Sequence, residues 1–176
     1  MTDYQYYEAL TEEQAKEELR VFLETKGKAV AELIESAAAA GLRADYSIET
    51  LSEVLRWGST LMKTIPVEPD LRLPQSYRES ETYKYSLFYL DEASMNRVHR
   101  FGYYLGETFI RNFKKLKWAS GNRETLDHNM PVVTGFKFKI EMPVSVIIEN
   151  IFCRIIVKGN TDNIDQAIEA WKKILP

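Results

Sequence analysis

Apolar residues recur at helical spacing through the first forty positions, which predicts one long amphipathic helix. Thr11 and Gln14 have the spacing of a capping box, in which a hydroxyl and a side-chain amide close the first turn. The phase continues across residues 26–27, so we expect a single helix, with any kink at that glycine. The alanines of 37–40, followed by Gly41, indicate the helix end, with the glycine in the left-handed conformation. The apolar face comprises Ala15, Leu19, Phe22, Leu23, Val30, Leu33, Ile34 and Ala37.

The same periodicity predicts two more helices. Ser47 is expected to cap the first of them, which ends before Pro66. The second covers about 91–116 and has an apolar and a charged side. Between them, the prolines of 66–80 predict a loop, and the tyrosine-rich stretch of 77–90 gives no prediction. The charged side of the 91–116 helix carries Arg97, Arg100, Tyr104, Glu107 and Arg111.

Two glycines lie one turn apart on the apolar side of the 91–116 helix. Gly102 and Gly106 have no side chain, so a neighbouring element can approach the helix backbone closely there. Glycine inside a helix costs about 1 kcal/mol relative to alanine, so a pair of them indicates a packing requirement. We therefore expect Gly106→Leu to destabilise the fold.

The β-structure is predicted by two short segments. Trp118 begins the first, and a polar loop follows at 121–130. In 136–142, apolar residues alternate with charged ones, which is the period of a half-buried strand. We expect the two segments to pair antiparallel, with helices covering the apolar face of so small a sheet.

The last third of the chain predicts two helices. Residues 143–158 are rich in β-branched side chains, but their polar positions recur every four or five residues, and Pro143 suits a first helical turn. We therefore predict a buried helix there. Asp162 is expected to cap the final helix, whose inner face consists of Ile164, Ala167, Ile168, Trp171, Ile174 and Leu175. Together these elements predict an α+β fold, with four or five helices packed around a two- or three-stranded antiparallel sheet.

Composition favours one soluble domain over residues 1–176, with 45% hydrophobic and 28% charged residues. The formal net charge of −3 argues against a dedicated nucleic-acid-binding protein. A single cysteine, Cys153, excludes an intramolecular disulfide, and with only His99 and His128 it excludes a Cys/His-rich zinc site. We expect no metal and no cofactor. The absence of a signal-peptide pattern and of long apolar runs favours a cytoplasmic protein without a membrane segment.

Charge is distributed unevenly along the chain. Six basic residues against Glu107 give 97–117 a local net charge of +5, whereas eight glutamates against four basic residues give 8–35 a net charge of −4. Solvated helix faces explain both, and the alternatives are a complementary protein partner, self-association or an anionic ligand. Because exposed charges contribute little to stability, reversing Arg97, Arg100 and Arg111 is expected to leave folding nearly intact.

Few residues suggest catalysis. His99 and Glu107 are eight residues apart, which does not suit a shared metal, and a core-edge histidine is the favoured interpretation of His99 over a catalytic base. The Asp127-His128 pair would activate a nucleophile only if a serine or Cys153 lay beside it, and Cys153 is expected to be a small core residue.

Ten tyrosines are many for a chain of 176 residues. Such side chains suit recognition surfaces, because they bury a large area at low entropic cost. The alternative is that they hold a long loop against the body. The clustered ones are Tyr4, Tyr6, Tyr7, Tyr77, Tyr83, Tyr85 and Tyr89.

The Tyr-Leu-Gly-Glu sequence at 104–107, followed by Lys117-Trp118 and by Pro131 and Pro143, resembles a unit of uncharacterised bacterial proteins. In these a Y-L-G-E helix precedes a short strand that carries tryptophan, and some look like immunity or accessory proteins of toxin and secretion systems. The resemblance covers about residues 95–145 and implies no active site.

These observations favour a non-enzymatic protein that binds another protein, with a toxin-neutralising, immunity-like role as the most concrete version. The oligomeric state stays open. One alternative is a small hydrolase or ligand-binding protein with a pocket near Glu107 and His99 or the 127–128 loop. Another is a phosphate or nucleic-acid contact through the basic face of 97–117. The candidate binding residues are Arg97, Arg100, Tyr104, Glu107, Arg111, Tyr77, Tyr83, Tyr85 and Tyr89.

Overall fold

The computed structural model describes residues 3–122 and 128–176, with side chains from Tyr6 onward in the first range. Eight α-helices and two separate two-stranded antiparallel sheets lie within these residues. The predicted α+β class is confirmed. The prediction of four or five helices around a single sheet is wrong. The helices are α1 (Asp3–Glu8), α2 (Glu12–Ala39), α3 (Ile48–Thr60), α4 (Gln75–Arg78), α5 (Glu81–Lys84), α6 (Glu92–Asn112), α7 (Val144–Lys158) and α8 (Asp162–Lys173). The strands are β1 (Thr64–Pro66), β2 (Phe88–Leu90), β3 (Lys117–Ser120) and β4 (Pro131–Thr134), and short 3-10 turns cover Tyr85–Leu87 and Lys137–Lys139.

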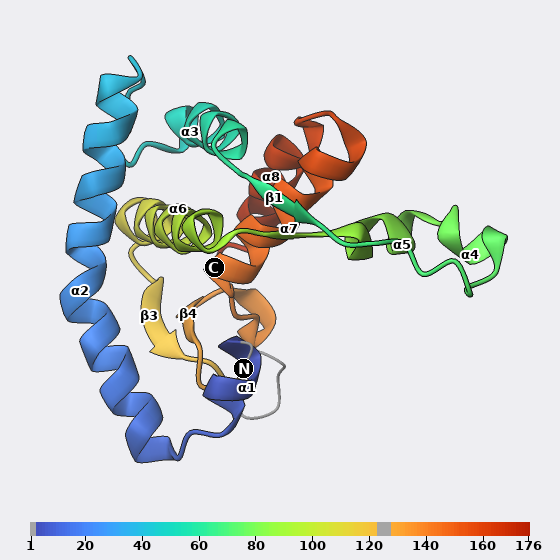
Figure 1. Ribbon diagram of the computed structural model, residues 1–176. Helices are drawn as coiled ribbons and strands as arrows, with labels where there is room; N and C mark the ends of the chain where they lie inside the picture. Colours follow the sequence, from blue (N-terminus) through green and yellow to red (C-terminus); the bar gives the residue numbers. More distant parts are fainter. Residues whose placement is uncertain (1–2, 123–127) are drawn as a thin grey trace.

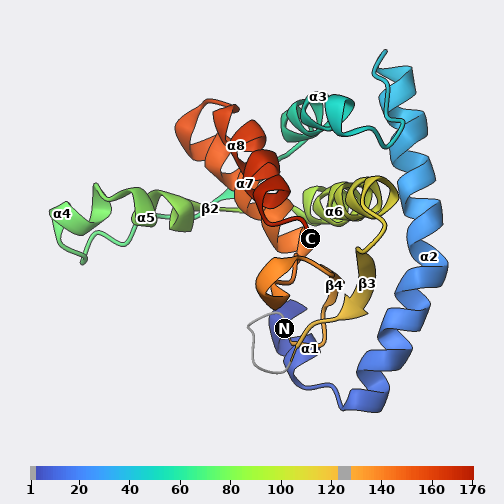
Figure 2. The same ribbon diagram turned by 180° about the vertical axis from the view of Figure 1, so that it is seen from behind.

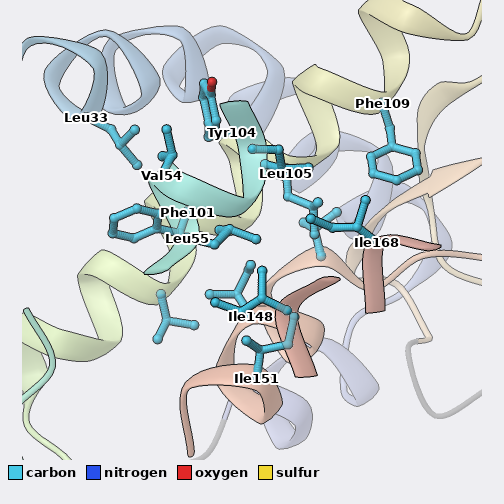
Figure 3. Packing of buried hydrophobic residues seen from close by; sticks show 14 of the residues in the cluster. Leu33, Val54, Leu55, Phe101, Tyr104, Leu105, Phe109, Ile148, Ile151 and Ile168 are labelled. Carbon is cyan, nitrogen blue, oxygen red and sulfur yellow. The ribbon is translucent and has the colours of Figure 1, made fainter. Parts of the chain in front are cut away.

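Helix α6 is the centre of the body. Helix α2 runs along one side of it, α3 and α7 pack on other sides, and α8 packs against α3 and α7 (Figures 1 and 2). Because neighbouring helices cover α6 on several faces, its side chains are buried around most of the helix (Figure 3). Its fully or almost fully buried residues include Val98, Phe101, Tyr104, Leu105 and Phe109. Among the described residues, no helix has both the length and the apolar character needed to cross a bilayer.

The ends of α2 follow the sequence prediction. The backbone N–H of Gln14 donates to Thr11 Oγ1 at 3.3 Å, and the N–H of Thr11 donates to Gln14 Oε1 at 2.8 Å, so the capping box is complete. Gly41 has φ +78°, and the N–H of Leu42 donates to the carbonyl of Ala37. This is the glycine-terminated helix end that the sequence predicts. The helix is continuous through residues 26–27.

Helix α3 ends earlier than predicted. It stops at Thr60, and Ile65 lies instead in β1, where it pairs with Tyr89 of β2. The chain leaves the helix because the backbone of Lys63 is held at both polar groups: its N–H donates to Ser94 Oγ and its carbonyl accepts from the N–H of Asp91. The helical spacing of apolar residues continues to Ile65, but beyond Thr60 the backbone hydrogen bonds are no longer those of a helix.

The predicted strand over 136–142 is wrong. Trp118 does lie in a strand, β3, but β3 pairs with β4, with Trp118 opposite Val133. After β4 the chain turns at Gly135, and Phe138 has a left-handed backbone with φ 60° and an 83% exposed side chain. Only Met142 returns to the sheet, through an isolated bridge to Val133. The alternation arose because Phe136 and Met142 are buried at the two ends of an irregular segment.

Residues 144–158 form a helix, as the spacing of their polar residues predicts and their β-branched content does not. The side chains of Val144, Ile148, Ile151 and Phe152 face the core. Pro143 occupies the N-cap position rather than the first turn, and Gly159 ends the helix with φ 70°. Helix α8 begins at Asp162, with Thr161 rather than Asp162 at the cap position.

Candidate functional site

The two oppositely charged helices of the sequence are each other's partners. Lys26 Nζ of α2 contacts Glu107 Oε1 of α6 at 2.6 Å, and Arg100 of α6 contacts Glu32 Oε2 of α2 at 3.0 Å. The first pair is mostly buried, since the side chains are 16% and 13% exposed. Charge complementarity along this seam is therefore satisfied within the chain, and these four residues join α2 to α6.

Glu107 lies at a three-way joint. Its carboxylate accepts hydrogen bonds from Lys26 of α2, from Trp118 Nε1 of β3 at 2.8 Å, and from Arg111 one turn along α6 at 3.4 Å. Burial alone would raise the pKa of Glu107, but the hydrogen bonds from Lys26 and Trp118 outweigh it, so the pKa lies below its usual value. An ionised carboxylate with three donors is well suited to hold the helices and β3 together.

Tyr104 is buried and does not lie on an outer face, which corrects the sequence interpretation. Its side chain is 0% exposed, its ring stacks on Tyr46, and its hydroxyl accepts a hydrogen bond from the N–H of Tyr46 at 3.2 Å. Arg111 covers the ring of Tyr46, with 3.6 Å between the guanidinium carbon and the ring centre. The segment between α2 and α3 thus covers a side of α6 that periodicity alone assigns to solvent.

Arg97 is the remaining arginine on the predicted charged side of the 91–116 helix. It is half-buried and, with Arg100, Trp57 and Phe101, lines a small cavity of about 70 Å³ between α2, α3 and α6. Its Nη1 atom is buried and has no hydrogen-bond partner among the described residues. Because Nη1 is inaccessible to solvent, it is also inaccessible to a ligand that enters from the surface.

Residues 64–90 form an arm that projects from the body (Figures 1 and 2). Strands β1 and β2 lead out and back, and α4 and α5 lie at the far end. The arm is ordered by its own contacts: the N–H of Val67 donates to the carbonyl of Leu87, and Arg78 Nε donates to that of Leu73. The stretch that gave no sequence prediction is therefore a defined element.

The four arm tyrosines divide between the two sequence hypotheses. Tyr83 is buried and its hydroxyl accepts from the N–H of Asp70, so it holds the arm together. The hydroxyl of Tyr85 donates to Glu81, which also pairs with Lys158 of α7. Tyr77 and Tyr89 are 48% and 56% exposed.

Exposed apolar side chains are concentrated on the arm. All three residues of β1 are exposed, and Leu71 is 74% exposed near the far end. Five of the eleven large hydrophobic residues that are exposed in the described part of the chain belong to it: Ile65, Val67, Leu71, Tyr77 and Tyr89. No stretch of equal length in the rest of the described chain carries as many exposed large hydrophobic side chains.

A second feature is a cavity of about 280 Å³ between α1, α6 and the start of α7. Nδ1 of His99 and Oγ of Ser145 lie 3.2 Å apart and both side chains line it. The other lining residues are Tyr6, Tyr7, Tyr103, Met130, Pro131 and Pro143. His99 thus lies within hydrogen-bond distance of a side-chain hydroxyl, and Ser145 is a candidate that the sequence analysis missed, because no motif marks it.

The remaining candidates do not meet at one site. Cys153 is half-buried on α7 beside Tyr85 and Tyr89 of the arm, and burial, with a contribution from Glu149, raises the pKa of its thiol to about 11. Such a thiol is protonated at neutral pH and is a poor nucleophile. His128 is half-buried, and Asp127 lies outside the described residues. Within the described residues, no group of three His, Cys, Asp or Glu side chains is placed to hold a metal ion.

Comparison of the chain with known protein families, with curated proteins and with solved structures found no match. The geometry described above therefore carries the functional argument by itself.

Proposed function

We propose that this protein binds another protein through the arm of residues 64–90. The observation that carries the proposal is the projection of this arm from the body with five large apolar side chains exposed on it. Exposed apolar groups of this size are costly to leave in water, and contiguous ones mark interaction sites in soluble proteins.

The charged groups of α6 favour the arm as the binding surface, because most of them already pair with other residues of this chain. Arg100 and Glu107 pair with α2, and Arg111 stacks on Tyr46. A partner that bound these groups would first have to break contacts that join parts of the body. The same argument disfavours a phosphate or nucleic-acid contact through this face.

The chemistry of the arm indicates what kind of partner fits it. Residues 64–90 carry four acidic and three basic side chains, so the arm is nearly neutral. Leu71 and Tyr77 are large anchors near its far end, and β1 and β2 form a ribbon of only two strands, with an unpaired edge on each. Aromatic and apolar anchors of this kind insert into an apolar groove, and a strand edge offers backbone hydrogen bonds. The immunity-like role implied by the resemblance would be one instance of such binding.

Site-specific cross-linking tests the proposal. A photoreactive phenylalanine derivative is placed at Leu71 or at Tyr89, and the producing cells are irradiated. Phe138 is the matched control, because it is exposed and lies on the body. We expect one partner protein to be cross-linked from both arm positions and not from Phe138.

The purified partner is then titrated against the wild type and Leu71→Asp. Because Leu71 is 74% exposed, the variant should keep its circular dichroism spectrum while its affinity falls at least about tenfold, the scale of a lost hot-spot contact. Equal cross-linking at Phe138, cross-links only to a second copy of this chain, or unchanged affinity of Leu71→Asp would contradict the proposal.

A further inference from the structure

The cavity between α1, α6 and α7 brings a hydroxyl and an imidazole into hydrogen-bond distance. Ser145 Oγ and His99 Nδ1 are 3.2 Å apart, although the residues are 46 positions apart in the chain. A serine becomes a nucleophile when an adjacent base accepts its proton, and the heavy-atom distance needed is about this long before a substrate binds. Both side chains are half-buried and line the cavity, so the pair is reachable from it.

A close helix contact holds the pair in place. The backbone of Ser145 lies so near Gly102 that a Cβ added to the glycine would be 3.0 Å from the serine Cα and N. Because Gly102 is one turn along α6 from His99, this close approach sets the first turn of α7 beside the imidazole. A side chain at position 102 would push Ser145 away. One of the two glycines of the sequence pattern thus positions the hydroxyl.

The cavity walls define the kind of molecule that fits. Tyr103 is packed edge-on against Phe22, and Tyr6 is held by a hydrogen bond from its hydroxyl to Glu18, so each presents an aromatic ring on a fixed element. The lining has no Asp, Glu, Lys or Arg among the described residues. At about 280 Å³ the cavity is at the small end of ligand pockets. A small uncharged molecule with an apolar or aromatic portion fits these walls.

We propose that Ser145 and His99 form a nucleophile–base pair that hydrolyses small, uncharged carboxylic esters in this cavity. Oγ of Ser145 bonds to the acyl carbon while its proton passes to Nδ1 of His99. The bond between that carbon and the alcohol oxygen then breaks, and the leaving alcohol takes the proton from the imidazolium. Water attacks the acyl-serine, gives a proton to His99, and the proton returns to Oγ as the carboxylic acid leaves.

Labelling with a fluorophosphonate tests the nucleophile directly, since the serine oxygen displaces fluoride from phosphorus to give a stable adduct. The expected tryptic peptide spans 140–154, and Ser145 is its only residue with a hydroxyl side chain. We expect the adduct on this peptide, no adduct there in Ser145→Ala, and a labelling rate about 100-fold or more lower in His99→Gln, the scale of lost general-base assistance. Ser59→Ala is the control, because Ser59 is a half-buried serine of α3 outside the cavity.

Hydrolysis of p-nitrophenyl butyrate gives a second readout, with thermal unfolding of each variant as the check on folding. We expect the rate of Ser145→Ala to fall to that of the uncatalysed reaction, and Ser59→Ala to match the wild type. An unlabelled 140–154 peptide in the folded wild type, or hydrolysis by folded Ser145→Ala at the wild-type rate, would overturn the proposal. These outcomes are independent of the arm, so they do not bear on partner binding.

Discussion

The indole of Trp118 occupies the space beside Gly106 that a side chain would fill. A Cβ added at Gly106 would overlap Cη2 and Cζ2 of the Trp118 ring. The same indole donates from Nε1 to Glu107, the next residue of α6, and its ring packs edge-on against Phe22 of α2. One tryptophan of β3 thus fixes the distance between the strand, α6 and α2.

Substituting Gly106 is expected to destabilise the protein. Gly106→Ala should lower the free energy of unfolding by roughly 1–3 kcal/mol, and Gly106→Leu by more, because the indole must move. Gly27→Ala is the matched control, because nothing lies within 4 Å of its added Cβ inside α2 and alanine is the better helix former. Urea unfolding of the three variants measures the difference. A Gly106→Ala variant as stable as Gly27→Ala would disprove the contact.

The stability contributed by Glu107 should depend on pH. Its pKa is lower in the folded protein than the usual value near 4.5, so the ionised group stabilises the fold above that value, and the contribution is lost as the pH falls through the folded pKa. Glu107→Gln should therefore be less stable than the wild type at pH 7, and the gap should narrow below about pH 4.5. Urea unfolding across pH measures it, with the exposed Glu53→Gln as the control. A gap that stays constant over this range would contradict the linkage.

Reversing the three arginines should destabilise the fold, contrary to the expectation from sequence. Arg100 pairs with Glu32, and Arg111 stacks on Tyr46 and contacts Glu107, so the substitutions place like charges together. Losses of roughly 1 kcal/mol for each such contact are typical of half-exposed ion pairs and cation–π contacts. The control reverses Lys137, Lys139 and Lys173, which are all exposed. Equal melting temperatures for the two triple variants would show that the arginine contacts contribute nothing.

Asn129 should determine whether α1 stays on the body. Its side-chain Nδ2 donates to the carbonyls of Tyr7 and Leu10, at 3.1 and 3.0 Å. Asn129→Asp keeps the shape and tolerates the left-handed backbone at φ 64°, but it replaces two donors with acceptors. We expect faster amide hydrogen exchange and faster proteolysis in residues 3–10, with the exchange of α6 unchanged. Unaltered exchange in that segment would rule out the tether.

Sequence periodicity correctly predicted the elements whose conformation is determined by interactions within the same segment. The capping box of Thr11 and the buried helix of 144–158 are local, because hydrogen bonds and polar spacing within one helix decide them. The strand expected at 136–142 failed because the turn at Gly135 depends on contact with a distant backbone: an added Cβ would overlap the carbonyl oxygen of Lys115. No spacing within one segment reports such a contact.

The candidate sites differ in how far the sequence alone predicts them. The tyrosines of 77–89 marked the arm, although their individual roles required its fold. Tyr104 and Glu107 fall on the charged side of a helix considered alone, which predicts exposure to solvent, whereas α6 is covered by α2, α3 and α7. Ser145 gave no signal at all, since its neighbour His99 reaches it only through the packing of α6 on α7.

The arm leaves the body and returns to it at almost one point, since the N–H of Asp91 donates to the carbonyl of Lys63 at 3.1 Å. The two ends of the arm therefore meet the body side by side. The entropy of closing a surface loop grows only slowly with its length, so insertions and deletions at the far end of the arm, away from Leu90 in the core and from the Glu81–Lys158 pair, cost the body little. Under the binding role proposed for the arm, a change in the length or sequence of this segment would change the partner, while the helices beneath it evolve under the separate demands of packing.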